Sequence, residues 1–147
     1  MNSGKTVTIL LVEDDPGHAR LIEKNLRRAN INNDIKVVGD GQEALDFLFG
    51  EGPYEGASLV SPLLILLDLN LPVLDGYQVL EKIKTDERTK RIPVIVLTTT
   101  SDPGEVTRCY ELGCNVYVVK PVDYTQFSEA IRNLGLFLPV VTIPDGE

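Results

Sequence analysis

The chain has 147 residues, 43% of them hydrophobic and 24% charged, which suits one globular domain and excludes a disordered chain or a disulfide-stapled mini-protein. Its 22 acidic and 14 basic residues leave a formal net charge of −8, which disfavours contact with a phosphate backbone, so we expect no nucleic-acid partner. No apolar run is long enough to span a bilayer and the amino terminus lacks the apolar core of a signal peptide, so we expect a cytoplasmic protein without membrane contact.

Five short apolar runs are candidate strands. Each has four or five residues, is rich in Val, Ile and Leu, and is bounded by polar residues, Gly or Pro. Near-continuous apolar runs of this length are typical of strands that are buried on both faces. The predicted strands are Thr8–Val12, Ile35–Val38, Leu63–Leu67, Val94–Leu97 and Val116–Val119.

Amphipathic segments alternate with these runs and are candidate helices. In the first of them, apolar residues recur at a spacing of three or four, which places them on one helical face. Asp15 precedes Pro16 and Gly17, so we expect Asp15 to cap the first helix. The stretch 50–62 is rich in Gly, Pro and Ser and is predicted to be a long surface loop. The predicted helices are Gly17–Ala29, Gln42–Phe49, Asp75–Lys84, Pro103–Leu112 and Tyr124–Leu138.

This alternation of strands and helices predicts an α/β fold. A parallel five-stranded sheet with helices on both faces, joined by right-handed crossovers, is a doubly wound fold. One domain is expected over residues 1–138, followed by a tail over 139–147. In such folds the ligand site lies at the carboxyl ends of the strands.

Polar and charged residues stand where four of the predicted strands end. Glu13 and Asp14 follow the first strand, Asp68 the third, Thr98 the fourth and Lys120 the fifth. The clustered acids are hard oxygen ligands that suit Mg²⁺, and without a metal their repulsion raises the proton affinity of at least one carboxylate. With a metal and Lys120 neutralising a phosphoryl group, Asp68 is placed to attack phosphorus and form an aspartyl phosphate.

The order of these motifs resembles the receiver domain of two-component response regulators. The segments LLVEDD, LLDLNLP followed by DG, VLTT and YVVKP occur in the family's order, and 30 residues separate Asp68 from Thr98 and 22 separate Thr98 from Lys120. The resemblance covers about residues 7–138. It implies a flavodoxin-like (βα)5 fold with strand order 2-1-3-4-5.

The resemblance also implies a role for each site residue. Asp68 matches the phosphoacceptor, and Lys120 matches the lysine that binds the phosphoryl group. The Mg²⁺ ligands implied are Asp68, Asp14, the backbone carbonyl of Asn70, and Glu13 acting through water. The family catalyses only its own phosphorylation and dephosphorylation, so we expect a signalling domain and not an enzyme acting on other substrates.

A switch is implied as well. Thr98 matches the hydroxyl that moves toward the phosphoryl oxygen, and Tyr117 the aromatic that then swings inward. Both changes are expected to alter the surface formed by helix Pro103–Leu112, strand Val116–Val119 and helix Tyr124–Leu138. Thr99 departs from the family, because this position is usually smaller, and the larger side chain is expected to narrow access to the site.

Two segments are longer than in most receivers. An extra stretch lies around residues 49–61, and an apolar tail runs from Phe137 to Glu147. Both features resemble the stand-alone response regulators that are paired with bacterial phytochromes. That resemblance implies a sensor histidine kinase as partner, a downstream protein contact, and a homodimer formed through the switch surface and the tail.

Three alternatives remain open at this point. A phosphatase of the haloacid-dehalogenase type also uses an aspartate and Mg²⁺, but it needs a DxD pair after its first strand, where this chain has Glu13-Asp14-Asp15. A degenerate receiver that binds partners without phosphorylation is disfavoured by the intact Asp68 and Lys120. A phosphate shuttle in a phosphorelay fits the same site residues.

Overall fold

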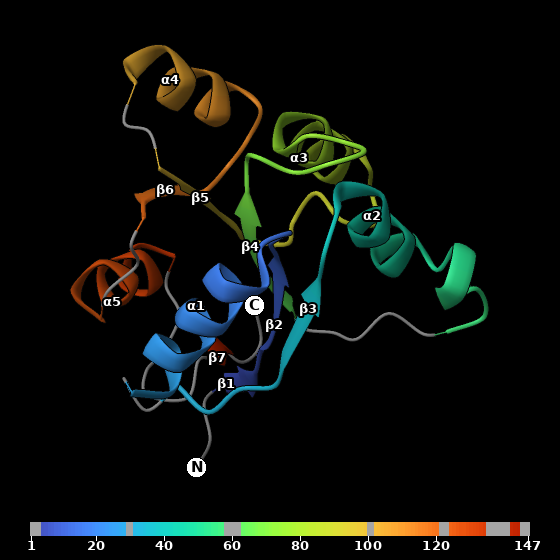
Figure 1. Cartoon of the computed structure of the whole chain (residues 1–147). Coiled ribbons are helices and arrows are strands. Elements are labelled where there is room, and N and C mark those ends of the chain that lie inside the picture. Colours follow the sequence, from blue (N-terminus) through green and yellow to red (C-terminus); the bar gives the residue numbers. More distant parts are fainter. Residues whose placement is uncertain are drawn as a thin grey trace.

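A five-stranded parallel sheet forms the centre of the fold in the computed structural model, which describes residues 4–28, 31–57, 63–99, 102–120, 124–134 and 142–144 (Figure 1). The strand order is β3-β2-β4-β5-β6, which is the predicted order 2-1-3-4-5 for the five strands counted along the chain. The strands are β2 (Thr8–Val12), β3 (Ile35–Val38), β4 (Leu63–Asp68), β5 (Val94–Thr98) and β6 (Val116–Val119).

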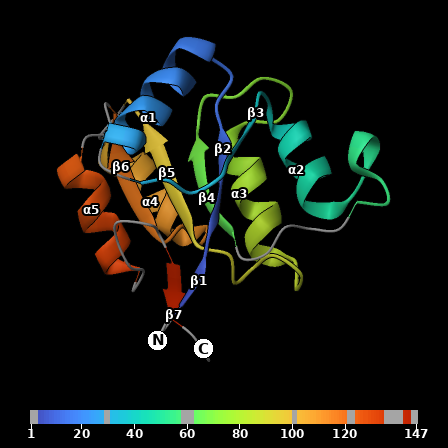
Figure 2. The ribbon, with the colours of Figure 1, turned by 90° about the horizontal axis from the view of Figure 1, so that it is seen from below.

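Helices cover both faces of this sheet (Figure 2). Every residue of β4 is buried, because each strand face meets a helical layer, and this explains the apolar runs without polar alternation. The helices α1 and α5 pack on one face, and α2, α3 and α4 pack on the other. The helices are α1 (Pro16–Arg28), α2 (Gly41–Phe49), α3 (Gly76–Thr85), α4 (Pro103–Glu111) and α5 (Tyr124–Asn133).

Aspartates begin four of the helices. Asp15 Oδ1 accepts hydrogen bonds from the backbone N–H groups of Gly17 and His18 at 2.8 and 3.2 Å, as predicted, and these bonds lower the pKa of Asp15. The side chains of Asp40, Asp75 and Asp102 each accept a hydrogen bond from the backbone N–H of the third residue of the following helix. The helix α5 ends at Asn133, short of the predicted Leu138, and residues 135–141 lie outside the described part of the chain.

The predicted loop 50–62 contains a short helix. The 3-10 helix η1 (Gly52–Tyr54) packs beside α2, where the rings of Phe47 and Tyr54 meet edge to face with centroids 5.2 Å apart. Three residues are too few to show a helical period, so the sequence did not reveal it. Residues 58–62 of the predicted loop lie outside the described residues.

A second sheet joins the two ends of the chain. The strand β1 (Gly4–Thr6) pairs antiparallel with β7 (Thr142–Pro144), so this part of the tail contacts the amino-terminal strand of its own chain. Because β1 leads directly into β2, the pair lies at the amino ends of the central strands, away from the predicted site. Within the described residues, the helices are too short or too polar for any of them to cross a membrane.

Candidate functional site

The carboxyl ends of four central strands meet around one cavity of about 220 Å³. Of the acids that follow or end these strands, Glu13 and Asp68 are buried and Asp14 is exposed. The predicted site residues therefore lie together at one edge of the sheet, as the topology requires. The cavity is lined by Glu13, Asp14, Asp15, His18, Asp68, Asn70, Thr99 and Lys120.

The loop after Asp68 folds tightly over the end of β4. The backbone N–H of Asn70 donates to Asp68 Oδ1 at 3.3 Å, and that of Gly76 donates to the Leu69 carbonyl at 2.9 Å. A Cβ atom at Gly76 would lie 2.7 Å from the Asp68 carbonyl oxygen and 2.5 Å from the Leu69 Cα. Glycine at position 76 thus permits the close approach that brings the start of α3 against the site.

Three acids are arranged as a candidate cation site. Glu13, Asp14 and Asp68 each offer one carboxylate oxygen, and these oxygens lie within 4.8 Å of one another. Hard carboxylate oxygens with an open, solvent-facing side fit Mg²⁺ or Mn²⁺, which keep several water ligands. The predicted fourth ligand, Asn70, lines the same cavity.

One lysine offsets part of this negative charge. Lys120 Nζ lies 2.6 Å from Glu13 Oε1 and 3.4 Å from Asp68 Oδ2. Burial and the neighbouring Glu13 carboxylate nevertheless raise the pKa of Asp68 to about 6, although Lys120 acts in the opposite direction. The pKa of Asp68 thus shifts in the expected direction, although burial contributes more to the shift than the repulsion between the carboxylates does.

The two threonines at the end of β5 have different positions. Thr98 is fully buried and is not among the residues that line the cavity, whereas Thr99 is exposed and lines it. The Tyr117 side chain forms a hydrogen bond with that of Thr98, and burial raises the pKa of Tyr117. The structure therefore brings the two predicted switch residues into contact behind the cavity.

His18 also lies at the cavity, a position that sequence reasoning did not assign to it. Its Nδ1 is 3.8 Å from Glu13 Oε2 and its Nε2 is 3.9 Å from Asp15 Oδ2. The only available signal was indirect: α1 starts just after β2, so residues of its first turn face the same sheet edge.

Fold and site together define a class. The chain belongs to the response regulator receiver domain family, whose family model matches residues 9–132. Members of this class are signalling domains that interact with histidine kinases and bind Mg²⁺ or Mn²⁺ at an acidic site, and they are generally not enzymes in the ordinary sense. The predicted family and fold are thereby confirmed.

Particular relatives narrow the comparison. The chain is 40% identical over 137 residues to response regulator Rcp1 from Synechocystis, and this alignment covers 92% of each of the two chains. A crystal structure of the Mn²⁺-bound form of Rcp1 matches with a TM-score of 0.74 over 94% of this chain and 99% of that one. The bacteriophytochrome response regulator AtBRR matches at 40% identity and a TM-score of 0.83, covering 92% and 97%.

A phosphorylated relative is also similar in structure. The phosphorylated cyanobacterial phytochrome response regulator RcpA matches at 38% identity and a TM-score of 0.72, covering 88% of this chain and 91% of that chain. The predicted resemblance to phytochrome-associated response regulators is therefore confirmed at the level of sequence and fold.

Proposed function

We propose that this protein is a stand-alone response regulator that accepts a phosphoryl group from a histidine kinase on Asp68, with Mg²⁺ as its cofactor. The observation that carries the proposal is the convergence of Asp68 with two further acids on one side and Lys120 on the other, around one open cavity. The matches to Rcp1 and AtBRR, which cover nearly the whole length of each relative, support the stand-alone form.

The chemistry follows from the positions of the charged groups. An oxygen of the ionised Asp68 carboxylate attacks phosphorus while the bond from phosphorus to the donor nitrogen breaks. Lys120 provides a fixed positive charge beside the acceptor. This charge attracts the negatively charged phosphoryl oxygens and favours the ionised form of Asp68 near neutral pH. Glu13, Asp14, Asp68 and the Asn70 carbonyl would hold the Mg²⁺, which supplies further neutralisation of phosphoryl charge when bound.

The signal is proposed to leave the site through the Thr98–Tyr117 contact. Movement of the buried Thr98 hydroxyl toward a phosphoryl group would remove its present hydrogen bond with Tyr117. Tyr117 belongs to β6, the edge strand flanked by α4 and α5. A rearrangement there would change the surface of α4, β6 and α5, which we propose as the contact for a downstream protein.

The donor is proposed to be a bacterial phytochrome kinase. This rests on the similarity to AtBRR and RcpA, whose names associate them with phytochromes. A homodimer through the α4–β6–α5 surface and the tail is part of the same proposal, and sedimentation of the truncated chain tests it.

Phosphorylation of purified protein tests the acceptor directly. With Mg²⁺ and acetyl phosphate, we expect one added phosphoryl group in the intact mass of the wild type and none in Asp68→Asn. Incorporation into Asp68→Asn at the wild-type level would reject the assignment. Failure of the wild type to incorporate phosphate would favour the degenerate receiver, and turnover of free phosphomonoesters would favour the phosphatase.

A further inference from the structure

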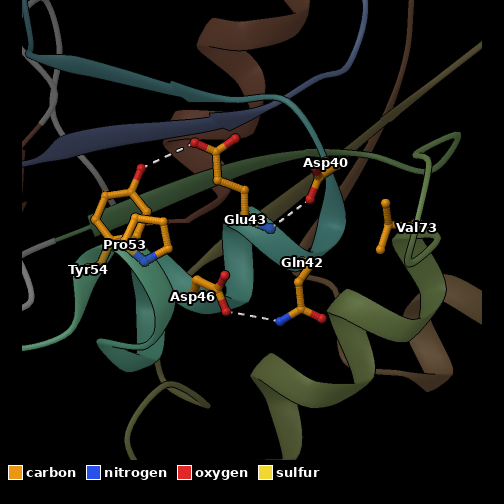
Figure 3. Close-up of a pocket in the computed structure, with 7 residues that line it drawn as sticks. All are labelled: Asp40, Gln42, Glu43, Asp46, Pro53, Tyr54 and Val73. Atoms are coloured by element: carbon orange, nitrogen blue, oxygen red, sulfur yellow. Dashed lines mark hydrogen bonds between the residues drawn. The ribbon is translucent and has the colours of Figure 1, made fainter.

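A second hollow lies apart from the Asp68 cavity, between α2, η1 and the loop that joins β4 to α3 (Figure 3). Its volume is about 430 Å³. Pro53 and Tyr54 of η1 form one wall and Val73 of the loop stands opposite, with the exposed side of α2 between them. We refer to this hollow as the α2–η1 slot.

The two walls of the slot differ in how they are supported. Tyr54 Oη donates a hydrogen bond to Glu43 Oε2 at 3.2 Å, and the Tyr54 ring packs edge to face against Phe47. Val73 has a φ of 69° and is 75% exposed. Left-handed backbone is unfavourable for a β-branched residue, and here it presents an apolar side chain to solvent across from an aromatic ring. Contact with a flat or apolar group would remove the exposed apolar surface of each wall from water, which is favourable.

The slot is lined by three acids that form no ion pair with the described residues. Asp40, Glu43 and Asp46 line it, and within the described part of the chain no basic group lies within ion-pair distance of these three carboxylates. The nearby Lys36 Nζ lies over the Tyr54 ring, 5.2 Å from its centroid. Asp46 Oδ1 accepts one hydrogen bond, from Gln42 Nε2, so carboxylate lone pairs remain for a further donor. A cationic occupant complements this arrangement.

Part of the slot lies on the same side of the sheet as the phosphoacceptor. Val73 belongs to the loop that follows Asp68, and Asp40 follows β3 at the carboxyl edge of the sheet, where the Asp68 cavity also lies. A protein that delivers a phosphoryl group to Asp68 must cover this edge.

We propose that the α2–η1 slot binds an arginine side chain from the protein that donates the phosphoryl group. A guanidinium has a flat face that stacks on an aromatic ring such as Tyr54 and several N–H donors for carboxylates such as Asp46, which a lysine ammonium combines less well. This inference rests on the proposed function, because it assigns the slot to the phosphodonor, and it adds a specificity contact outside the reacting groups.

The binding test uses a probe peptide of known sequence. Acetyl-Ala-Arg-Ala-Arg-Ala-amide is titrated into the ¹⁵N-labelled protein, with the same peptide carrying citrulline, which is neutral, as control. We expect arginine-dependent shifts confined to residues of α2, η1 and the β4–α3 loop, and binding at least about tenfold weaker with citrulline. Equal shifts with both peptides, or shifts spread over other acidic surfaces, would overturn the proposal.

Variants on α2 locate the binding. Asp46→Lys should weaken binding of the arginine peptide about tenfold. Gln42→Lys should have a similar effect, because it changes an exposed residue and adds a cation four positions before Asp46. Glu81→Lys, an exposed position on α3 with the same change of charge as Asp46→Lys, should bind within about twofold of the wild type. Loss of binding in Glu81→Lys alone, or in all three variants equally, would count against the slot.

Phosphotransfer then assigns the slot to the donor. From the phosphorylated kinase core of a bacteriophytochrome, we expect transfer to Asp46→Lys to be about tenfold slower than to the wild type and to Glu81→Lys. Acetyl phosphate, which is too small to reach the slot, should phosphorylate all three equally. Equal transfer from the kinase to all three proteins overturns the assignment.

Two failures are distinguishable in this design. No transfer from this kinase to a wild type that acetyl phosphate does phosphorylate would reject the phytochrome donor and the slot assignment together. No phosphorylation of the wild type by either donor would reject the proposed function, while the peptide titration would still decide whether the slot binds arginine.

Discussion

At the scale of single residues, opposing effects set the pKa of Asp68. Burial and the adjacent Glu13 carboxylate disfavour its charge, while Lys120 at 3.4 Å favours it. The first two effects prevail, and the pKa rises from 3.8 to about 6. An acceptor with this pKa is mostly ionised at neutral pH, but its charge destabilises the metal-free fold.

This balance predicts a pH dependence of stability. The pKa of Asp68 is higher in the folded state than in the unfolded state, so protonation of Asp68 stabilises the fold. This stabilisation is complete below about pH 4 and is lost as the pH rises through about 6. Asn cannot lose a proton, so Asp68→Asn should not suffer this loss. In EDTA, the free energy of unfolding of Asp68→Asn minus that of the wild type should therefore increase by about 2 kcal/mol from pH 4 to pH 7, since one pKa unit corresponds to about 1.4 kcal/mol.

Urea denaturation across this pH range measures the difference. Glu81→Gln, which neutralises an exposed acid on α3, is the matched control and should track the wild type. If Asp68→Asn also ran parallel to the wild type at every pH, the balance of charges described for Asp68 would be wrong.

At the scale of elements, the start of α3 shows how a loop and a helix shape the site. The loop after β4 returns so closely that Gly76 lies against the Asp68 carbonyl. The capping box at Asp75 and Gln78 then fixes the first turn of α3. The loop thus has little freedom to move away from the acceptor without disturbing the helix.

Gly76→Ala should therefore be costly. The new Cβ would collide with backbone atoms of Asp68 and Leu69, which cannot give way as a flexible side chain can, so we expect a loss of about 2 kcal/mol or more in free energy of unfolding. Gly39→Ala is the control, because its Cβ would meet nothing closer than Glu43 Oε1 at 4.0 Å, and it should change stability by less than about 1 kcal/mol. Equal effects of the two substitutions in urea denaturation would contradict this account.

At the scale of the whole molecule, the site and the paired chain ends occupy opposite ends of the sheet. The carboxyl ends of the central strands hold the acids, and β1 with β7 forms a separate two-stranded sheet beyond their amino ends. Two-stranded sheets are marginal alone, so the tail should be separable from the core.

Truncation after Leu138 tests this separation. Hydrogen exchange of the Gly4–Thr6 amides should become fast because β7 is lost, while the protection of β2, β4 and β5 should stay unchanged. Sedimentation of the same protein tests the proposed dimer, since a tail-mediated dimer should become monomeric at micromolar concentration. Loss of protection throughout the central sheet would show that the tail is integral to the core.

The sequence by itself determined the five central strands, their alternation with helices and the acids and lysine at the strand ends. Runs such as Thr8–Val12 carry a local signal because both faces of the strand are buried, and parallel topology places all the strand ends at one edge. For the same reason Asp68 and Lys120 could be paired from sequence, although 52 positions separate them along the chain.

Only the tertiary structure decided features that depend on contacts between distant or very short segments. No hydrophobic period in the sequence marks these features. They are the burial of Thr98 against Tyr117, the position of His18 at the cavity, the α2–η1 slot and the pairing of β1 with β7. Each arises where two segments meet in space, and a one-dimensional pattern reports only the environment of a segment, not the identity of its neighbour.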